Sequence, residues 1–293
     1  MQQWPLPFPI SPRPLTQVLG LTCCVKVVDI GASPIDDVPP YRPLLREGLA
    51  EIVGFEPNPL ALAELMKSKG PYETYLPYAV GDGKRHELKF CRASGMTSLL
   101  DPNADLLGLF HGFSEWSEII ARAPIDTVRL DDVPEAAGLD LLKIDIQGAE
   151  LMVFENAASR LDGALVVQTE VEFVPLYRDQ PLFSDIDRLL RGHGFLLHRF
   201  DDVISRLIKP LAVNADIGAG LSQQLWADAI YVKDFTRPDR LTPEQLVKLA
   251  VILHECYGSY DLALHFLRAH DQRLGTAYSA AYLAFLRDAI AAE

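Results

Sequence analysis

Cysteine is scarce in this chain, and its few copies lack the spacing of a metal site. They are Cys23, Cys24, Cys91 and Cys256 among 293 residues, and no two are arranged as C-x-x-C. A zinc knuckle or a disulfide framework needs paired cysteines, so the sequence argues against both. Sparse, reduced thiols are typical of the cytoplasm, where we expect the protein to reside.

Long apolar runs are also missing. No stretch approaches the ~18 consecutive apolar residues of a membrane span, so we expect no membrane partner. The opening MQQWPLPFPISPRPL lacks the basic head and apolar core of a secretory signal. Five prolines fall within its first fourteen residues. Because proline has no backbone N–H to donate, we expect residues 1–20 to form an extended arm.

Basic residues are outnumbered by acidic ones. The chain has 27 Lys and Arg against 40 Asp and Glu, which gives a net charge of −13. A protein whose main work is to grip nucleic acid needs a basic face, so we expect no nucleic-acid partner. The apolar content of 49% and charged content of 23% are those of a globular protein and exclude wholesale disorder.

Short apolar runs alternate with helical patterns from Val25 onward. The strand-like runs cover residues 25–30, 51–56, 73–80, 139–146 and 164–171. Their near-continuous apolar character indicates burial on both faces, as in a parallel sheet. Helical segments occupy 42–49, 59–70, 149–161 and 183–194. This strand–helix repetition predicts a doubly wound α/β sheet with right-handed crossovers.

Two parts of the chain depart from this rhythm. Residues 86–91 and 125–130 are predicted to be extra strands around a long insertion, and 195–200 and 227–235 form a late pair. Beyond 235, Thr242 and Pro243 open an amphipathic helical hairpin, and a further helix is predicted near 278–290. We therefore divide the chain into an arm (1–20), a sheet domain (21–235) and a helical extension (236–293). The extension is expected to pack either on the sheet domain or on a second copy in a homodimer.

Carboxylates close four of the predicted strands. They are Asp29, Glu56, Asp145 and Glu170. The carboxyl ends of parallel strands lie along one edge of a sheet, where open α/β folds bind ligands. A single acid at a strand end is most often a helix cap. Four such acids at one edge favour a binding site.

A glycine turn follows the first strand in VVDIGASP. Gly31 allows a tight turn and close approach of a ligand to the backbone. The later glycines of the dinucleotide-binding motif are replaced by Ser33 and Asp36, which argues against NAD or a flavin dinucleotide. Glu56 lies 25 residues beyond Gly31, near the spacing at which an acid binds a ribose diol. Glu56 either binds a ribose or caps the next helix.

The sequence contains a series of motifs that also occur, in the same order, in a known protein family. In chain order they are VDIGAS, GFEPNP, YAVGDG, MTSLL, RLDDV, LLKIDIQGAEL and TEVEFVPLYRDQPLFSDI. The chain thereby resembles the FkbM family of S-adenosylmethionine-dependent methyltransferases, mostly O-methyltransferases, over residues 25–200. The resemblance implies a Rossmann-like class I methyltransferase sheet of seven strands whose last strand, here 227–235, runs antiparallel.

The resemblance also implies a set of cofactor contacts for S-adenosylmethionine. Ala79 and Val80 would flank the adenine, and Asp82 would accept from its amino group. Thr97 and Ser98 either reach the polar tail of the cofactor or cap the following helix. The family's further glycine is replaced by the long loop SPIDDVPPYRP, which leaves contacts beyond Ser33 open. The implied cofactor-binding residues are Asp29, Gly31, Ala32, Ser33, Glu56, Ala79, Val80, Asp82, Ser98 and Asp145.

Three residues are the candidates for catalysis. Asp145 either accepts the proton of an acceptor hydroxyl or caps the helix that follows it. Lys143 shares strand parity with Asp145, so it either orients that carboxylate or simply pairs with an acid. Glu170, with Glu172 on the same face, either helps to hold a divalent ion or binds the acceptor. We expect the second arrangement, without a metal.

The sequence thus predicts a methyltransferase that acts on a hydroxyl of a sugar or secondary metabolite, with a small-molecule or glycan partner. The sugar is suggested by family analogy alone. An alternative hypothesis is a catalytically inactive α/β scaffold that binds proteins through its helical tail. A nucleotide-dependent dehydrogenase is disfavoured by the missing glycines.

Overall fold

The computed structural model describes residues 13–32, 38–214 and 216–291. These form two compact units. The sheet unit comprises Val27–Asp36 and Ile52–Lys233, and the helical unit comprises Met1–Lys26, Asp37–Glu51 and Asp234–Glu293. The helical unit therefore takes residues 37–51 from the segment assigned above to the sheet domain, in addition to the expected extension.

A seven-stranded sheet, here called the main sheet, forms the centre of the sheet unit. Its strands lie in the order β3 (Glu73–Leu76), β2 (Ala50–Phe55), β1 (Val25–Ile30), β7 (Leu141–Ile144), β8 (Val166–Glu172), β10 (Gln224–Lys233) and β9 (Phe195–Ser205). The pairs β2–β3, β1–β7 and β7–β8 are parallel, whereas β10 runs antiparallel to β8 and β9. The expected class I methyltransferase sheet, with its antiparallel last strand, is confirmed.

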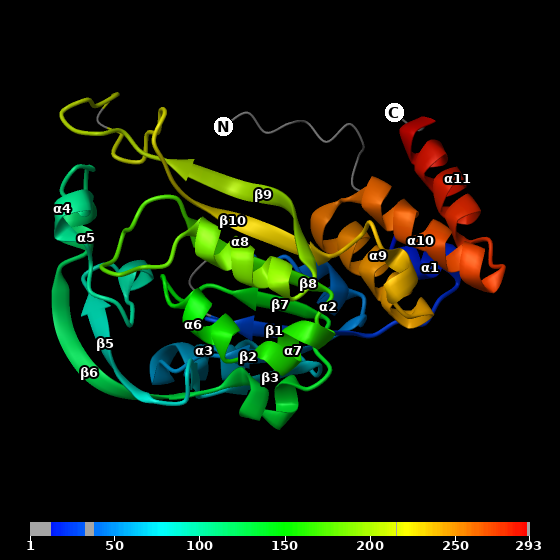
Figure 1. Ribbon diagram of the computed structural model, residues 1–293, viewed down its shortest axis with the longest axis horizontal. Helices are drawn as coiled ribbons and strands as arrows, with labels where there is room; N and C mark the ends of the chain where they lie inside the picture. Colours follow the sequence, from blue (N-terminus) through cyan, green and yellow to red (C-terminus); the bar gives the residue numbers. More distant parts are fainter. Residues whose placement is uncertain (1–12, 33–37, 215, 292–293) are drawn as a thin grey trace. The chain divides into compact units, whose positions relative to one another are not determined.

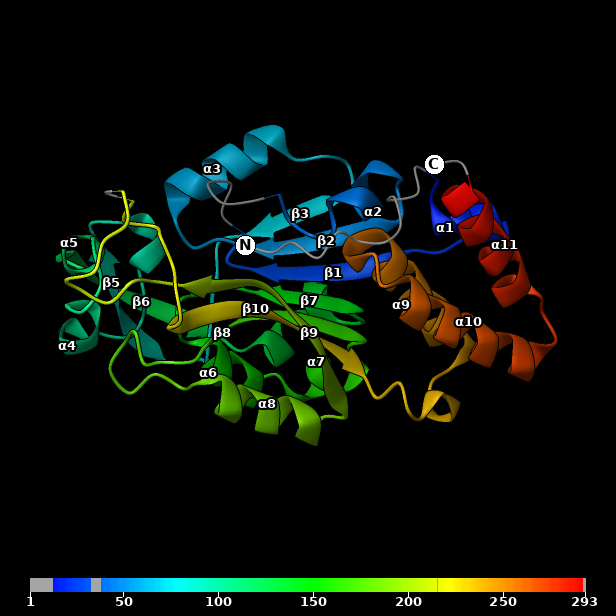
Figure 2. The same ribbon diagram turned by 90° about the horizontal axis from the view of Figure 1, so that it is seen from above.

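Helices cover both faces of the main sheet. Figure 2 shows α3 (Pro59–Ser68) on one face and α6 (Glu150–Glu155), α7 (Ala158–Gly163) and α8 (Phe183–Gly192) on the other. Buried strand residues such as Leu142 and Val167 pack with Phe154 of α6 in one cluster of the core. The helix expected over 149–161 is interrupted between α6 and α7. Asn156 there donates from its side chain to Met152 O at 2.9 Å, a local bond that competes with a continuing helix.

A second, three-stranded sheet, here called the ribbon, extends from the sheet unit (Figure 1). It has the order β4 (Ala79–Val80), β6 (Ile119–Val128) and β5 (Arg85–Cys91). The single strand expected over 73–80 is therefore wrong. Pro77 lies between β3 and β4, and because it has no N–H to donate, it suits the break between two ladders.

The connection from β5 to β6 forms a small core of its own. It contains η1 (Ser94–Met96), α4 (Ala104–Leu107) and α5 (Phe113–Trp116). Phe110, Phe113 and Tyr177 are buried there, and Trp116 and Trp226 pack against them. The short 3-10 helices η2 (Leu130–Asp132) and η3 (Pro134–Ala136) lead from β6 to β7.

The helical unit is built from α1 (Leu15–Leu19), α2 (Arg42–Arg46), η4 (Pro238–Arg240), α9 (Pro243–Tyr257), α10 (Tyr260–Leu274) and α11 (Tyr278–Ala291). Thr242 caps α9 by accepting from Gln245 N at 3.2 Å, as the sequence predicts. Helix α9 packs against α10, α1 and α2, and α10 packs against α11.

The arm expected over residues 1–20 is only partly tested, because residues 1–12 lie outside the described chain. Within the described part the expectation is wrong, since Leu15–Leu19 form a helix after the last proline of the arm, Pro14. Leu15 is buried and its N–H donates to Glu255 Oε1 at 2.7 Å, which fixes the start of this helix.

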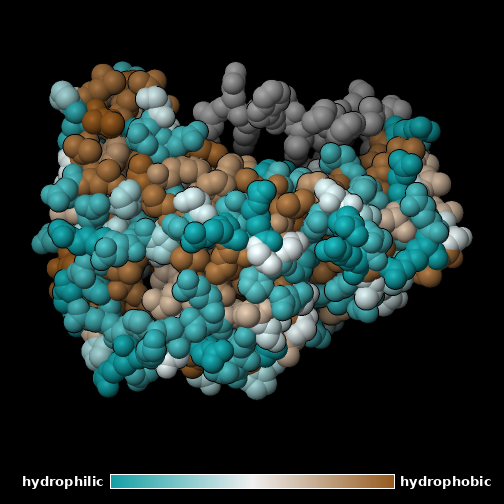
Figure 3. All heavy atoms as spheres, viewed as in Figure 1, coloured by the Kyte–Doolittle hydropathy of each residue, from teal (hydrophilic) through white to brown (hydrophobic). Residues whose placement is uncertain are grey.

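The visible surface is mostly hydrophilic (Figure 3), with hydrophobic residues gathered near α4, α5 and the connection between β9 and β10. The exposed apolar side chains of these segments are Leu109, Ile208, Leu211, Val213, Ile217 and Leu221. Among the helices that the structure describes, none has the length and apolar character needed to cross a membrane.

Candidate functional site

The glycine turn after β1 lies at a cavity of about 900 Å³ in the sheet unit. Gly31 has φ +83°, and a side chain there would collide with the carbonyl oxygen of Asp145, so only glycine fits. The N–H groups of Gly31 and Ala32 both donate to Phe55 O at 3.1 Å, and Asp145 N donates to Ile30 O at 3.1 Å. These bonds bring the ends of β1, β2 and β7 together, as predicted for the carboxyl edge of the sheet.

Glu56 follows β2 directly and lines the cavity. Its side chain is buried, and Oε1 accepts from Asn58 N at 2.7 Å. Burial raises the pKa of Glu56, the Asn58 bond opposes this effect and Asp29 adds to it. Helix α3 is capped by Asn58, whose side chain accepts from Leu60 N at 2.9 Å. The alternative in which Glu56 caps that helix is therefore not what the structure shows.

Asp145 lies directly after β7 and also lines the cavity. Gln147 donates from Nε2 to Asp145 Oδ1 at 2.9 Å and approaches Glu170 Oε2 at 3.2 Å. Helix α6 begins at Glu150 with Ala149 as its N-cap and without a side-chain capping bond. The alternative in which Asp145 caps that helix therefore has no support in the geometry.

Gln147 is itself held from three directions. Its carbonyl accepts from Ser98 Oγ at 2.6 Å, and Tyr177 OH lies 3.3 Å from its Oε1. Its φ of +60° is a left-handed conformation that is uncommon outside glycine and is kept only where surroundings enforce it. The backbone and side-chain contacts together fix the amide against Asp145.

Lys143 pairs with Asp29 behind the cavity. Its Nζ lies 3.3 Å from Asp29 Oδ1, and neither residue is among those that line the cavity. Burial disfavours the charged amine, but Asp29, Asp145 and Asp228 together raise the pKa of Lys143 above its ordinary value. The lysine thus remains charged and partly neutralises the acids at this edge.

Three further acids lie beside Asp145: Glu150 and Glu172 are buried, and Glu170 is half-buried. Burial raises the pKa of Glu150 to about 7, although its Oε1 accepts from Ile146 N at 2.8 Å. Burial, followed by neighbouring carboxylates, raises the pKa of Glu170 and of Glu172 well above the ordinary value. Across the described residues, no group of three or more His, Cys, Asp and Glu is arranged to hold a metal ion.

The remaining residues of the implied cofactor set divide into three groups. Ala79, Val80 and the buried Ser98 line the cavity, although the first two belong to the ribbon. Ala32 is buried outside the lining, and Ser33 lies beyond the described residues.

Asp82 does not reach the cavity. Its Oδ1 lies 2.7 Å from His86 Nε2 and accepts from Lys84 N at 3.0 Å, and the hydrogen bond with His86 lowers its pKa.

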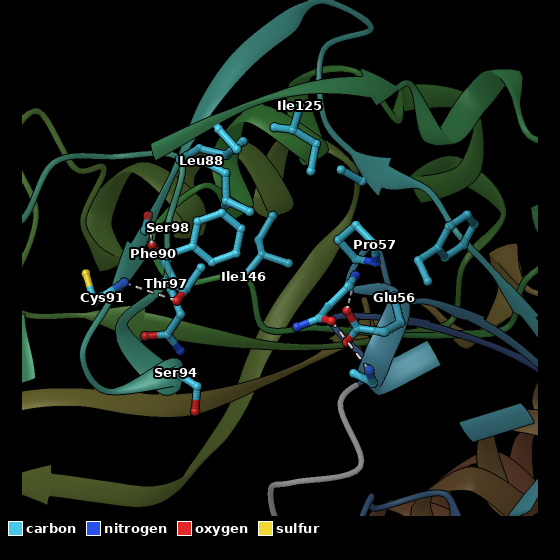
Figure 4. Close-up of a pocket in the computed structure, with 18 of the residues that line it drawn as sticks. Glu56, Pro57, Leu88, Phe90, Cys91, Ser94, Thr97, Ser98, Ile125 and Ile146 are labelled. Atoms are coloured by element: carbon cyan, nitrogen blue, oxygen red, sulfur yellow. Dashed lines mark hydrogen bonds between the residues drawn. The ribbon is translucent and has the colours of Figure 1, made fainter. Parts of the chain in front are cut away.

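Sequence reasoning missed two components of the cavity. Gln147 stands inside the quoted motif LLKIDIQGAEL, but its contacts come from distant segments. The other component is an apolar wall, visible in Figure 4, that includes Leu88, Phe90, Ile125 and Ile146. The alternation of apolar and charged residues in HELKFC (86–91) was the available signal for Leu88 and Phe90.

The strand order, the antiparallel β10 and the cavity at the carboxyl edge define a class I methyltransferase fold. The family model described as Methyltransferase FkbM domain matches residues 29–197, more than half of the chain. The chain belongs to the FkbM methyltransferase family.

Three relatives show the range of similarity. The 2-O-methyltransferase NoeI of Sinorhizobium fredii is 28% identical over 172 residues, 56% of this chain and 70% of NoeI. A methyltransferase FkbM structure from Methylobacillus flagellatus has 15% identity and a TM-score of 0.38, over 75% of this chain and 48% of that one. Magnesium protoporphyrin IX methyltransferase from Synechocystis, solved with bound SAM, has 11% identity and a TM-score of 0.35, over 75% and 76%. The chain thus spans about half the length of the Methylobacillus protein.

Proposed function

We propose that this protein is an S-adenosylmethionine-dependent O-methyltransferase that acts on a hydroxyl of a small molecule or glycan. The observation that carries the proposal is the meeting of Gly31, Glu56 and Asp145 around one cavity of about 900 Å³. That volume lies within the range of about 300–1,000 Å³ typical of small-molecule sites. The name of NoeI, a 2-O-methyltransferase, supports a hydroxyl as the acceptor. The cytoplasmic location and the homodimer stay predictions.

The cavity suits a nucleoside at the end of β2. Glu56 would accept from the ribose hydroxyls, and Ala79 and Val80 would flank the adenine. Gly31 leaves room at the backbone where any other residue would collide with Asp145 O. When bound, S-adenosylmethionine supplies a methyl group on a sulfonium, which is open to in-line displacement.

The chain's own chemical contribution is the placement of Asp145. Its carboxylate would accept the proton of the acceptor hydroxyl or hold its oxygen in line. Gln147 fixes Asp145 through Oδ1 at 2.9 Å, and this contact leaves Oδ2 as the atom available to the acceptor. Glu170 is less well placed as a base, because it is not among the residues that line the cavity. Lys143 acts through charge, since it pairs with Asp29.

Calorimetry tests the cofactor half of the proposal. S-adenosylmethionine and its demethylated product should bind, and NAD should not. Glu56→Ala should weaken binding by about 1.5–3 kcal/mol, the range for a hydrogen bond to a charged group. Glu51→Ala, which removes an exposed glutamate from the same strand, is the matched control. Unchanged affinity in Glu56→Ala would remove that residue from the ribose role, and tighter binding of NAD would overturn the cofactor.

Methyl transfer tests the catalytic half. With labelled S-adenosylmethionine, label should appear in an alcohol or sugar from a panel of hydroxylated small molecules. An inactive scaffold would bind no cofactor and transfer no label, which is the outcome expected of the protein-interaction alternative.

A further inference from the structure

We infer that the apolar face of the ribbon binds the apolar body of an uncharged hydroxylated acceptor, so that the substrate is an amphiphile with its hydroxyl at Asp145. The inference rests on the proposed function and narrows its substrate class. It depends on four observations: the two-faced character of the ribbon, the partial exposure of its apolar face, the continuity of the cavity, and the charges in the cavity wall.

The two faces of the ribbon differ in chemistry. On β5, Leu88 and Phe90 line the cavity, and β6 contributes Ala123 and Ile125, with Leu88 opposite Ala123 in the ladder. Because side chains alternate across a strand, these residues share one face. The ribbon therefore presents a continuous apolar surface to the cavity.

The opposite face of the ribbon is charged. Arg122 binds Glu87 at 2.6 Å and Asp101 at 2.7 Å, and all three of these side chains are partly exposed. Lys89, further along β5, is buried and donates to Leu99 O at 2.7 Å. The alternation along β5 and β6 thus separates a charged face from an apolar one.

The apolar face is not fully buried by the protein itself. Leu88, Phe90 and Ile125 are only half-buried. Ile120 is the extra residue at the register shift between the pairs Phe90–Ala121 and Cys91–Ile119; it also lines the cavity and is 61% exposed. Apolar surface left in water is unfavourable, and its burial by a ligand recovers that energy. An apolar wall of this kind inside a cavity marks a binding surface.

The apolar wall is continuous with the proposed reaction site. The same cavity is lined by Asp145, Ile146 and Gln147. In the view of Figure 4, Ile146 lies between Phe90 on one side and Pro57 and Glu56 on the other. A cofactor held at Glu56 would thus occupy one side, and the apolar body of the acceptor the other.

The charges of the lining favour an uncharged acceptor. Among the described lining residues, the charged ones are Glu56, Asp145 and Arg92. Arg92 donates from Nε to Glu118 at 3.0 Å, so its guanidinium is already paired with a carboxylate. A phosphate or carboxylate acceptor would meet two acids and no cation dedicated to it, whereas a neutral hydroxyl and an apolar body suit the wall.

A matched pair of glycosides tests the inference. In saturating S-adenosylhomocysteine, calorimetry compares methyl β-glucoside with octyl β-glucoside below its micelle concentration, since the two differ only in their tails. We expect octyl glucoside to bind at least about tenfold more tightly, because each buried methylene adds to affinity. Ile120→Ser should remove most of that preference and leave the affinity for S-adenosylhomocysteine unchanged. Ile120 is exposed, so the variant should fold, and Ile208→Ser, another exposed isoleucine outside the lining, is the control.

The outcomes separate this inference from the proposed function. Equal affinity for both glycosides, or no binding of the octyl glycoside, overturns the apolar subsite while S-adenosylhomocysteine binding stands. A loss of S-adenosylhomocysteine affinity in Ile120→Ser would assign the apolar wall to the cofactor and also overturn the inference. Failure of the wild-type protein to bind S-adenosylhomocysteine counts instead against the proposed function, on which the inference rests.

Discussion

The main sheet and the ribbon bury their apolar residues in different ways. In the main sheet, β7 is mostly apolar because helices cover both faces of the sheet, and side chains such as Leu142 and Val167 are fully buried. In the ribbon, apolar and charged residues alternate, and the apolar face meets a cavity instead of a helix. The difference teaches that an apolar side chain can stabilise a core in one sheet and line a cavity in the other, where we propose that it binds the acceptor.

The largest expected effect is a loss of turnover that is not accompanied by a loss of cofactor affinity. Asp145→Asn keeps the size of the side chain but removes the basic carboxylate at the edge of the main sheet. Turnover should fall about a hundred- to ten-thousand-fold, the usual contribution of a general base. Affinity for S-adenosylmethionine should change little. Single-turnover rates with an acceptor found in the panel check the first part, and calorimetry checks the second.

The matched control for that experiment lies on the ribbon. Asp126→Asn alters an aspartate of β6 whose side chain is 82% exposed, and it should leave turnover unchanged. If Asp145→Asn lost affinity and turnover equally, Asp145 would be a cofactor-binding or folding residue. Full activity would mean that alignment alone drives the reaction.

Substitution of two phenylalanines compares how much the core of the main sheet and the wall of the ribbon each contribute to the free energy of unfolding. Phe154 is fully buried in the core against the main sheet, whereas Phe90 is half-buried on the cavity wall. Phe154→Ala should lower the free energy of unfolding by about 3–5 kcal/mol, because it leaves a cavity in a packed core. Phe90→Ala should cost clearly less, about 1–2 kcal/mol. Urea unfolding measures both, and equal losses would show that the ribbon face is ordinary core.

The buried acids of the main sheet should make stability depend on pH. Burial raises the pKa of Glu150 from 4.5 to about 7. Between these values the folded state binds more protons than the unfolded state, so the free energy of unfolding falls as the pH rises through this window. Glu150→Gln should remove up to about 3 kcal/mol of this decline, because the amide oxygen can still accept from Ile146 N. Glu170 and Glu172, whose pKa values shift in the same direction, would retain theirs.

Urea unfolding at about pH 5 and about pH 8 would measure that decline. Glu64→Gln, at a glutamate whose side chain is 62% exposed, is the control and should leave the pH dependence as in the wild type. An unaltered slope in Glu150→Gln would place the proton on another member of the acidic group.

The smallest effect belongs to the charged face of the ribbon. Arg122→Ala removes two ion pairs at a side chain that is 44% exposed, and exposed pairs contribute little because water screens them. The free energy of unfolding should therefore change little. A thermal melt measures it, and a much larger loss would mean that these pairs hold the ribbon in place.

The main sheet could be predicted from sequence, because strands buried on both faces leave uninterrupted apolar runs such as 25–30 and 139–146. The ribbon could be predicted only as extra strands. Its pairing with Ala79–Val80 depends on a break at Pro77 that periodicity does not reveal. Glu56 and Asp145, which line the cavity, could be selected from the sequence because each directly follows an apolar strand.

Gln147 could not be assigned a role from its local pattern. Its partners Ser98, Tyr177 and Glu170 lie 49, 30 and 23 residues away along the chain, so only the folded structure brings them together. The prediction for Asp82, in contrast, missed a contact that is local in the sequence. A local partner, His86, lies within hydrogen-bond distance of the carboxylate that the resemblance implied for the adenine.

The close approach of Gly31 to Asp145 couples two parts of the site that are usually discussed separately. The turn at Gly31 is bonded to the end of β2, and Ile30 O before it accepts from Asp145 N, so the glycine turn and the end of β7 are bonded to each other. Neither part can be adjusted alone, because a displacement of the turn moves the carboxylate with it. Attempts to redesign the substrate range of this protein should therefore change the apolar side chains of the ribbon, because substitutions there leave the hydrogen bonds between the Gly31 turn and β7 in place.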